Sequence, residues 1–102
     1  MTILEAIQSY LTDYDVNSTL IEKVLIDNEV DGTATYSTDY IKEVEICLAY
    51  IYKQLALRDD FKQGSLSITN SQSKKLMNLA SNIFKKYGIT DEIINKTIIK
   101  IL

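Results

Sequence analysis

The fold is decided by one stretch between the two longest helical patterns, Leu57-Arg58-Asp59-Asp60-Phe61-Lys62-Gln63-Gly64-Ser65-Leu66-Ser67-Ile68-Thr69-Asn70. It contains the single arginine of the protein. Its second half, residues 65–69, alternates polar and apolar residues with the period of a short strand. A lone strand leaves backbone groups unpaired. We therefore expect this segment to pair with residues 33–36, with a hairpin partner or with another chain, or else to be an ordered loop.

The composition of the whole chain predicts one all-α domain over residues 1–102. Proline is absent, and the three glycines stand where elements should end, at positions 32, 64 and 88. Nothing therefore interrupts long helices. A chain of this length and hydrophobicity can build a core without a disulfide or a metal. We expect a bundle of four to five helices with a short β-strand or hairpin excursion between the third and fourth.

Two short helices are predicted before the long one. Thr2 and Glu5 have the spacing of a capping box, and Thr19 is expected to cap the second helix after a polar turn. Gly32 is expected to end that helix in a left-handed conformation, and residues 33–38 form a loop that could add a short edge strand. The apolar faces are Ile3, Ala6, Ile7, Tyr10 and Leu11, then Leu20, Ile21, Val24 and Leu25.

The third helix, expected over Asp39 to Leu57 with Ser37 or Thr38 as its cap, is apolar on two sides. Such a helix is covered on both sides. It is either the central helix of the domain, or its second band meets another subunit. The main stripe is Ile41, Val44, Leu48, Ile51 and Leu55, flanked by Tyr40, Cys47 and Tyr52, and the second band is Ile46, Tyr50 and Leu57.

The fourth helix is expected from a cap at Asn70 or Ser71 to Tyr87, where Gly88 ends it. A final segment follows Thr90, and its β-branched run leaves both helix and strand open. This apolar end needs a place to dock, in its own subunit or the next. The apolar faces are Leu76, Met77, Leu79, Ala80, Ile83, Phe84 and Tyr87, then Ile93, Ile94, Thr97, Ile98, Ile101 and Leu102.

The sequence offers no residues for familiar enzyme chemistry. Histidine is absent, which removes histidine-based acid–base catalysis and metal binding. Cys47 lies in an apolar helical pattern and is predicted to be a buried structural thiol. Residues 13–18 imitate the start of an EF-hand loop, but Ser18 replaces its glycine and Val24 its closing glutamate. We predict no catalytic, cofactor-binding or metal-binding residues, and an enzyme is the last of the candidate functions.

The net charge and hydropathy of the sequence do not favour nucleic acids or membranes as specific partners. The formal charge is −3 and the pI is about 4.8, which does not suit a phosphate-binding surface. The lysine pairs 74–75 and 85–86 are expected on a solvent face. No apolar run approaches a membrane span and no signal peptide is visible, so we expect a soluble, intracellular protein with no small-molecule substrate.

A family resemblance arises from the long helix, the quoted stretch and the capped helix that ends Phe84-Lys85-Lys86-Tyr87-Gly88. From about Ala49 to Gly88 this pattern resembles the helical adaptor branch of tailed-bacteriophage head–tail connector proteins. The resemblance implies a ring beneath the portal that continues the DNA channel. It also implies contacts with the portal and with downstream tail or stopper proteins, DNA only as non-specific cargo, and a location in the host cytoplasm and then in the virion neck.

The sequence is compatible with three functions, which we rank, and with one candidate interaction surface. A structural head–tail connector comes first, a small helical interaction or regulatory module second, and a helix-turn-helix DNA-binding regulator third. The acidic balance suits a channel through which DNA slides, and a lumen rich in lysine would contradict this. The candidate interaction surface consists of Arg58, Asp59, Asp60, Phe61, Lys62, Leu66, Ile68, Ile46, Tyr50, Leu57, Ile101 and Leu102.

Overall fold

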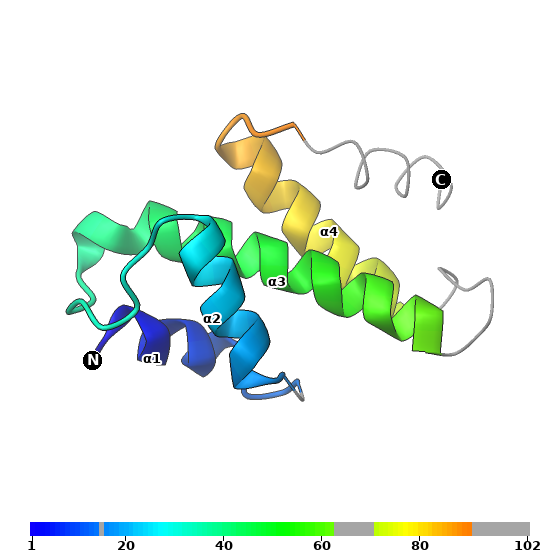
Figure 1. Ribbon diagram of the computed structural model, residues 1–102. Coiled ribbons are helices and arrows are strands. Elements are labelled where there is room, and N and C mark those ends of the chain that lie inside the picture. Colours follow the sequence, from blue (N-terminus) through cyan, green and yellow to red (C-terminus); the bar gives the residue numbers. More distant parts are fainter. Residues whose placement is uncertain (15, 63–70, 91–102) are drawn as a thin grey trace. The chain divides into compact units, whose positions relative to one another are not determined.

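The part of the chain that the structure describes is mostly helical. A computed structural model describes residues 1–14, 16–62 and 71–90. The elements are α1 (Ile3–Tyr10), α2 (Ser18–Asp27), a 3-10 turn (Thr38–Tyr40), α3 (Ile41–Lys62) and α4 (Ser71–Lys86) (Figure 1). The all-α prediction is confirmed, and these residues include no strand. The excursion at residues 65–69 and the segment after Thr90 lie outside the described residues.

The start of α1 is held by its own cap and by a distant loop. The predicted capping box is present: the Thr2 N–H donates to Glu5 Oε1 at 2.8 Å, and the Glu5 N–H donates to Thr2 Oγ1 at 3.1 Å. The N–H groups of Ile3 and Leu4 donate to the carbonyl oxygens of Ala34 (2.9 Å) and Gly32 (3.0 Å). The donors that a helix leaves open at its start are therefore satisfied here by protein atoms.

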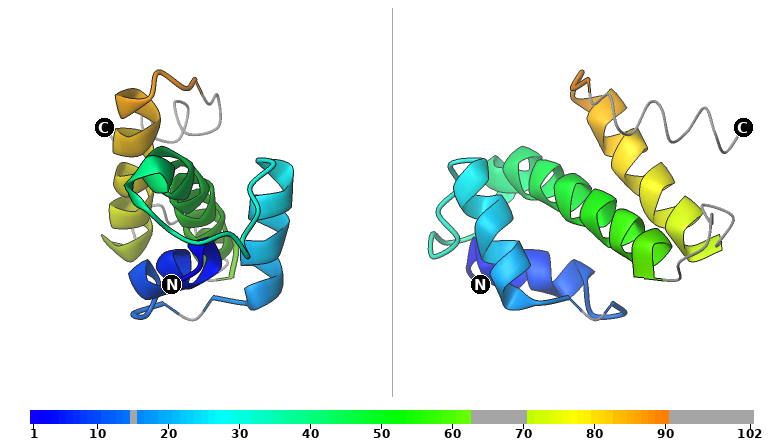
Figure 2. Two further views of the ribbon diagram at one scale, coloured as in Figure 1. Left: turned by 90° about the vertical axis from the view of Figure 1, so that its left-hand side faces the viewer. Right: turned by 45° about the vertical axis from the view of Figure 1, so that its right-hand side comes forward.

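The loop that supplies these carbonyls connects α2 to α3 and returns past the N-terminus of the chain (Figure 2). It forms a single antiparallel bridge between Thr2 and Thr35, and the Tyr36 N–H donates to the Met1 carbonyl at 2.8 Å. The edge strand that residues 33–38 could have added is therefore reduced to one bridge.

Helix α2 begins and ends differently from the prediction. Asn17, not Thr19, caps it, and its side chain accepts from the Thr19 N–H at 2.8 Å. At the other end Glu29, with φ 57°, takes the left-handed conformation expected of Gly32. The N–H groups of Glu29 and Val30 donate to Ile26 and Leu25 at 3.0 and 2.9 Å, which is the Schellman pattern.

Gly32 has a different role. A Cβ atom built there would lie 2.9 Å from Leu25 Cδ1 and 3.4 Å from Leu4 Cβ. The loop therefore passes close to the helices at this position, and glycine is needed for the close approach rather than for a left-handed turn.

Substitutions at the two residues with left-handed backbone, Glu29 and Gly88, should change the stability of the protein in opposite directions. Glu29→Gly should stabilise the protein by about 0.5–1 kcal/mol, because it removes the left-handed penalty of an L-residue. Gly88 (φ 67°) ends α4 with the same hydrogen-bond pattern, and no atom lies within 4 Å of an added Cβ. Gly88→Ala should therefore cost about 1 kcal/mol through the backbone alone. Urea unfolding of both variants checks this; equal effects of one sign would contradict it.

Helix α3 ends five residues later than predicted, at Lys62 instead of Leu57, and it begins at Ile41, after the 3-10 turn that includes Asp39. The predicted helix ended at Leu57 because the apolar periodicity ends there. However, no proline or glycine precedes Gly64 to stop the helix. The backbone of residues 58–62 is therefore helical, and the expectation that they form a loop is wrong.

Most apolar residues of α3 are buried or half-buried. The main stripe is buried from Val44 to Leu55, and Cys47, Ala49, Tyr52 and Ala56 are buried beside it. Ile41 and Tyr40 are exceptions, 39% and 38% exposed, because they lie at the entry to the helix. The second band is half-buried at Ile46, Tyr50 and Leu57.

Helix α4 is amphipathic as predicted. Leu76, Met77, Ala80 and Phe84 are buried, and Leu79, Ile83 and Tyr87 are half-buried. The buried hydroxyl of Ser73 donates to the Ala56 carbonyl of α3 at 3.4 Å, which links the start of α4 to α3. Helix α4 begins at Ser71, and the other predicted cap residue, Asn70, lies outside the described residues.

The chain divides into two compact units, Met1–Ile51 and Tyr52–Leu102, and the boundary falls inside α3. The buried residues of the first unit come from α1, α2 and the first half of α3. Ile3, Ala6 and Ile7 of α1 belong to this core, whereas Tyr10, predicted on the same face, is 55% exposed. The buried residues of the second unit come from the rest of α3 and from α4.

Candidate interaction surface

The structure describes only part of the interaction surface that the sequence predicts. Leu66, Ile68, Ile101 and Leu102 lie outside the described residues. Positions 58–62, predicted in a loop, form the end of α3. The structure brings together Ile46, Tyr50 and Leu57, which share one face of α3 by their spacing and are half-buried. In a single copy this band is therefore partly covered.

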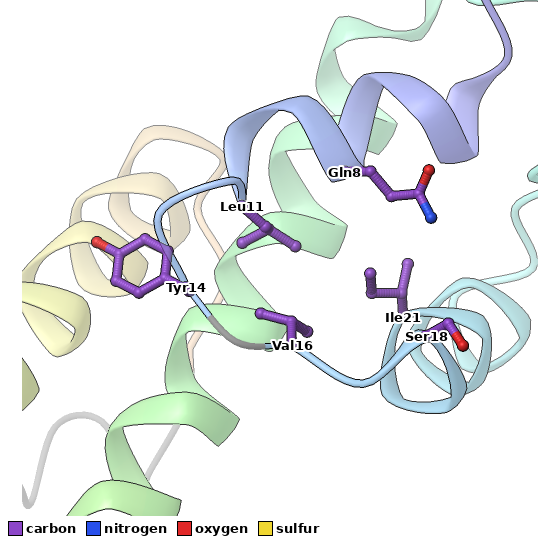
Figure 3. A pocket seen from close by; sticks show the side chains of 6 residues that line it. All are labelled: Gln8, Leu11, Tyr14, Val16, Ser18 and Ile21. Atoms are coloured by element: carbon purple, nitrogen blue, oxygen red, sulfur yellow. The ribbon is translucent and has the colours of Figure 1, made fainter.

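A small pocket lies between the end of α1 and the start of α2. Its volume is about 210 Å³ and its lining is Gln8, Leu11, Tyr14, Val16, Ser18 and Ile21. Figure 3 shows Leu11, Val16 and Ile21 turned toward a common space, with Gln8 and Ser18 on one side and Tyr14 on the other. Pockets for small ligands usually measure about 300–1,000 Å³, so this one is small for a substrate.

The same turn contains the EF-hand-like segment. The Asn17 side chain caps α2, and Ser18 is the first residue of that helix. Val24, at the position of the closing glutamate of an EF-hand, is buried in the core. Within residues 1–14, 16–62 and 71–90, no three acidic, cysteine or histidine side chains group as metal ligands would. None of the helices described there is long and apolar enough to cross a membrane.

Cys47 is inaccessible to solvent, with an exposed fraction of 0%. Burial, with a smaller contribution from the nearby Glu43 carboxylate, raises the pKa of its thiol to about 11. One Glu43 carboxylate oxygen is itself buried without a hydrogen-bond partner. The thiol is therefore protonated at neutral pH, as a structural cysteine should be.

Native Cys47 should resist alkylation. At pH 8 we expect the folded protein to react with iodoacetamide at least about a hundredfold more slowly than the urea-unfolded protein, because the thiol is buried and protonated. Because its folded pKa exceeds the unfolded value, its contribution to stability is present below about pH 9 and is lost between 9 and 11. Mass spectrometry measures the labelling, and Cys47→Ala should remove this part of the pH dependence. Equal labelling rates would contradict the buried thiol.

Formal charge is distributed very unevenly between the two units, which the sequence interpretation missed because it considered only the total. Residues 1–51 contain ten acidic and two basic side chains, a formal charge of −8. Residues 52–102 contain nine basic and four acidic side chains, a formal charge of +5. Counting charge separately in each half would have shown this in the sequence.

Most of the acidic side chains in the first unit face solvent. Hydrogen bonds from Thr2, led by its backbone N–H, lower the pKa of Glu5, and those from Thr33, led by its hydroxyl, lower the pKa of Asp31. Both therefore remain ionised at neutral pH. Lys23 pairs with Asp27 at 2.7 Å. The exposed acids among the described residues are Glu5, Asp13, Glu22, Asp27, Glu29, Asp31 and Asp39.

Four of the nine basic side chains of the second unit lie on α4, which contains no acidic residue. We call Lys74, Lys75, Lys85 and Lys86 the α4 lysine face. Lysines 75, 85 and 86 are exposed and Lys74 is half-buried. The two pairs are eleven residues apart, which is three turns or roughly 16 Å along one side of the helix. The Lys86 ammonium lies 5.3 Å from the centre of the Tyr87 ring, a cation–π distance.

Comparison with known proteins gives a family. A family model described as "Family of unknown function (DUF6706)" matches residues 1–101. The chain belongs to the DUF6706 family. The residues of this DUF6706 protein that match the family model span both compact units and include the α4 lysine face. Searches of curated proteins and of solved structures gave no match.

Proposed function

We propose that the protein is a non-enzymatic, self-assembling structural component of a tailed-bacteriophage virion, a head–tail connector. The separation of charge within one chain carries the self-assembly part of this proposal. Two halves of opposite sign on the same molecule favour contact between unlike surfaces of identical copies. Contacts between unlike surfaces close into rings when the rotation between copies permits it.

The place in the virion is supported by the resemblance of residues 49–88 to connector adaptors. In this part of the chain a long helix, α3, precedes α4, which ends at the left-handed Gly88. The proposed ring lies beneath the portal and also meets downstream tail or stopper proteins. A short β-type excursion at residues 65–69 belongs to the proposal as a further contact with a neighbouring copy.

A DNA channel sets a condition on the orientation of the copies. DNA must slide through the ring without sticking, and lysines bind phosphate groups. The α4 lysine face should therefore be turned away from the lumen. Each copy has a formal charge of −3, so a ring of copies is negatively charged as a whole, which suits DNA passage.

Binding to the portal protein encoded in the same genome tests this function. The full-length chain should co-purify with the portal, and electron microscopy of the complex should show an additional ring at its base. Portal, capsid and tail genes are expected beside its gene. A gene in an operon with a repressor, together with no portal binding, would favour the regulatory-module alternative. Specific DNA binding would favour the helix-turn-helix regulator.

A further inference from the structure

We infer that the α4 lysine face is a docking surface for the acidic first unit of a second copy of this chain. The inference rests on the proposed self-assembly and names the surfaces that make the contact. It concerns a helix that carries a lysine pair near each end, three turns apart, and contains no acidic residue of its own. The proposed occupant is the unit formed by residues 1–51.

Charge complementarity identifies this occupant. The first unit carries a formal charge of −8, and exposed carboxylates are present on α1, on α2 and on the connection from α2 to α3. The hydrogen bonds that hold Glu5 and Asp31 keep two of these carboxylates in place. An acidic surface of fixed geometry suits lysines, whose ammonium groups act as compact charges on flexible stems.

The contact joins unlike surfaces, because like charges facing each other across an interface are unfavourable. A two-fold dimer satisfies it reciprocally, with α4 of each copy against the first unit of the other, and a head-to-tail arrangement satisfies it with two neighbours. In the head-to-tail arrangement a copy offers α4 to one neighbour and its first unit to the other. The proposed ring uses this second arrangement.

Charge reversal and mixing in the full-length protein test the inference. One variant carries glutamate at the four positions of the α4 lysine face. The second carries lysine at five exposed acids of the first unit, which changes the formal charge of that unit from −8 to +2: Asp13, Glu22, Asp27, Glu29 and Asp39. None of the five belongs to the α1 capping box or to the Asp31–Thr33 hydrogen bonds, and the change at Asp27 removes only an exposed ion pair with Lys23. A control variant carries arginine at the four α4 positions and keeps the charge.

Sedimentation velocity at low ionic strength measures self-association. The wild type and the arginine control should associate, and association should weaken as salt shortens the screening length. Each reversed variant alone should associate at least about tenfold more weakly, because both of its surfaces now have one sign. A 1:1 mixture of the two reversed variants should recover association, because every contact in an alternating assembly is again between opposite charges.

Several results would overturn the inference. Circular dichroism first shows that each variant is folded. A wild type that stays monomeric at low salt overturns it, as does association that the α4 reversal leaves unchanged. Salt-dependent DNA binding by a monomeric wild type, lost on α4 reversal, would assign this face to nucleic acid instead. Portal binding by a monomeric wild type would keep the connector function while removing this contact.

Discussion

Proline at position 54 should destabilise the protein by at least about 3 kcal/mol. Gln54 is exposed and lies in the interior of α3, so the substitution removes no core side chain. Proline cannot donate to the carbonyl of the preceding turn, and its ring clashes with that carbonyl. Small domains have about 5–15 kcal/mol of stability in total, so the variant should be largely unfolded on mild heating.

The matched control is Gln54→Ala, which keeps the helix and should change stability by less than about 0.5 kcal/mol. Urea denaturation followed by circular dichroism measures both variants. If proline and alanine behaved alike, α3 would be interrupted in solution. The continuous helix across the boundary between the two units would then be incorrect.

The second large effect is expected at Ile7, the most deeply buried residue of α1, with an exposed fraction of 0%. Ile7→Ala should cost about 2–5 kcal/mol, because it removes buried apolar atoms and leaves a cavity. Ile7→Val removes a single methyl group and should cost about 0.5–1.5 kcal/mol. The difference between these two variants in urea unfolding measures how firmly α1 is packed.

A loss below about 1 kcal/mol for Ile7→Ala would mean that α1 does not belong to the core. Tyr10 on the same helix provides a comparison, because it is 55% exposed. Tyr10→Ala should change stability by less than about 1 kcal/mol. It should also leave self-association at the wild-type level if Tyr10 takes no part in assembly.

Local patterns predicted much of the fold. The capping box at Thr2 and Glu5, the apolar face of α4 and the role of Gly88 follow from short-range rules. The end of α3 does not, because residues 58–62 have no apolar period and no helix breaker. The caps of α2 also could not be chosen from sequence, since Asn17 and Thr19 are both good cap residues, and a glutamate is rarely left-handed.

Long-range pairing was the other part that the sequence did not show. Neither propensity nor periodicity indicates that the carbonyls of residues 32 and 34 complete the start of α1. The candidate site was missed for a simpler reason. A net charge of −3 conceals halves of −8 and +5, and the α4 lysines were read only as a solvated face.

Electron microscopy of the wild-type protein at low ionic strength, alone and with its portal, is the most direct test of ring formation. We expect closed rings in which each copy meets its neighbours through unlike surfaces, with the α4 lysine face outside the lumen. A two-fold symmetric dimer, or a ring whose lumen is lined by the α4 lysine face, would contradict it.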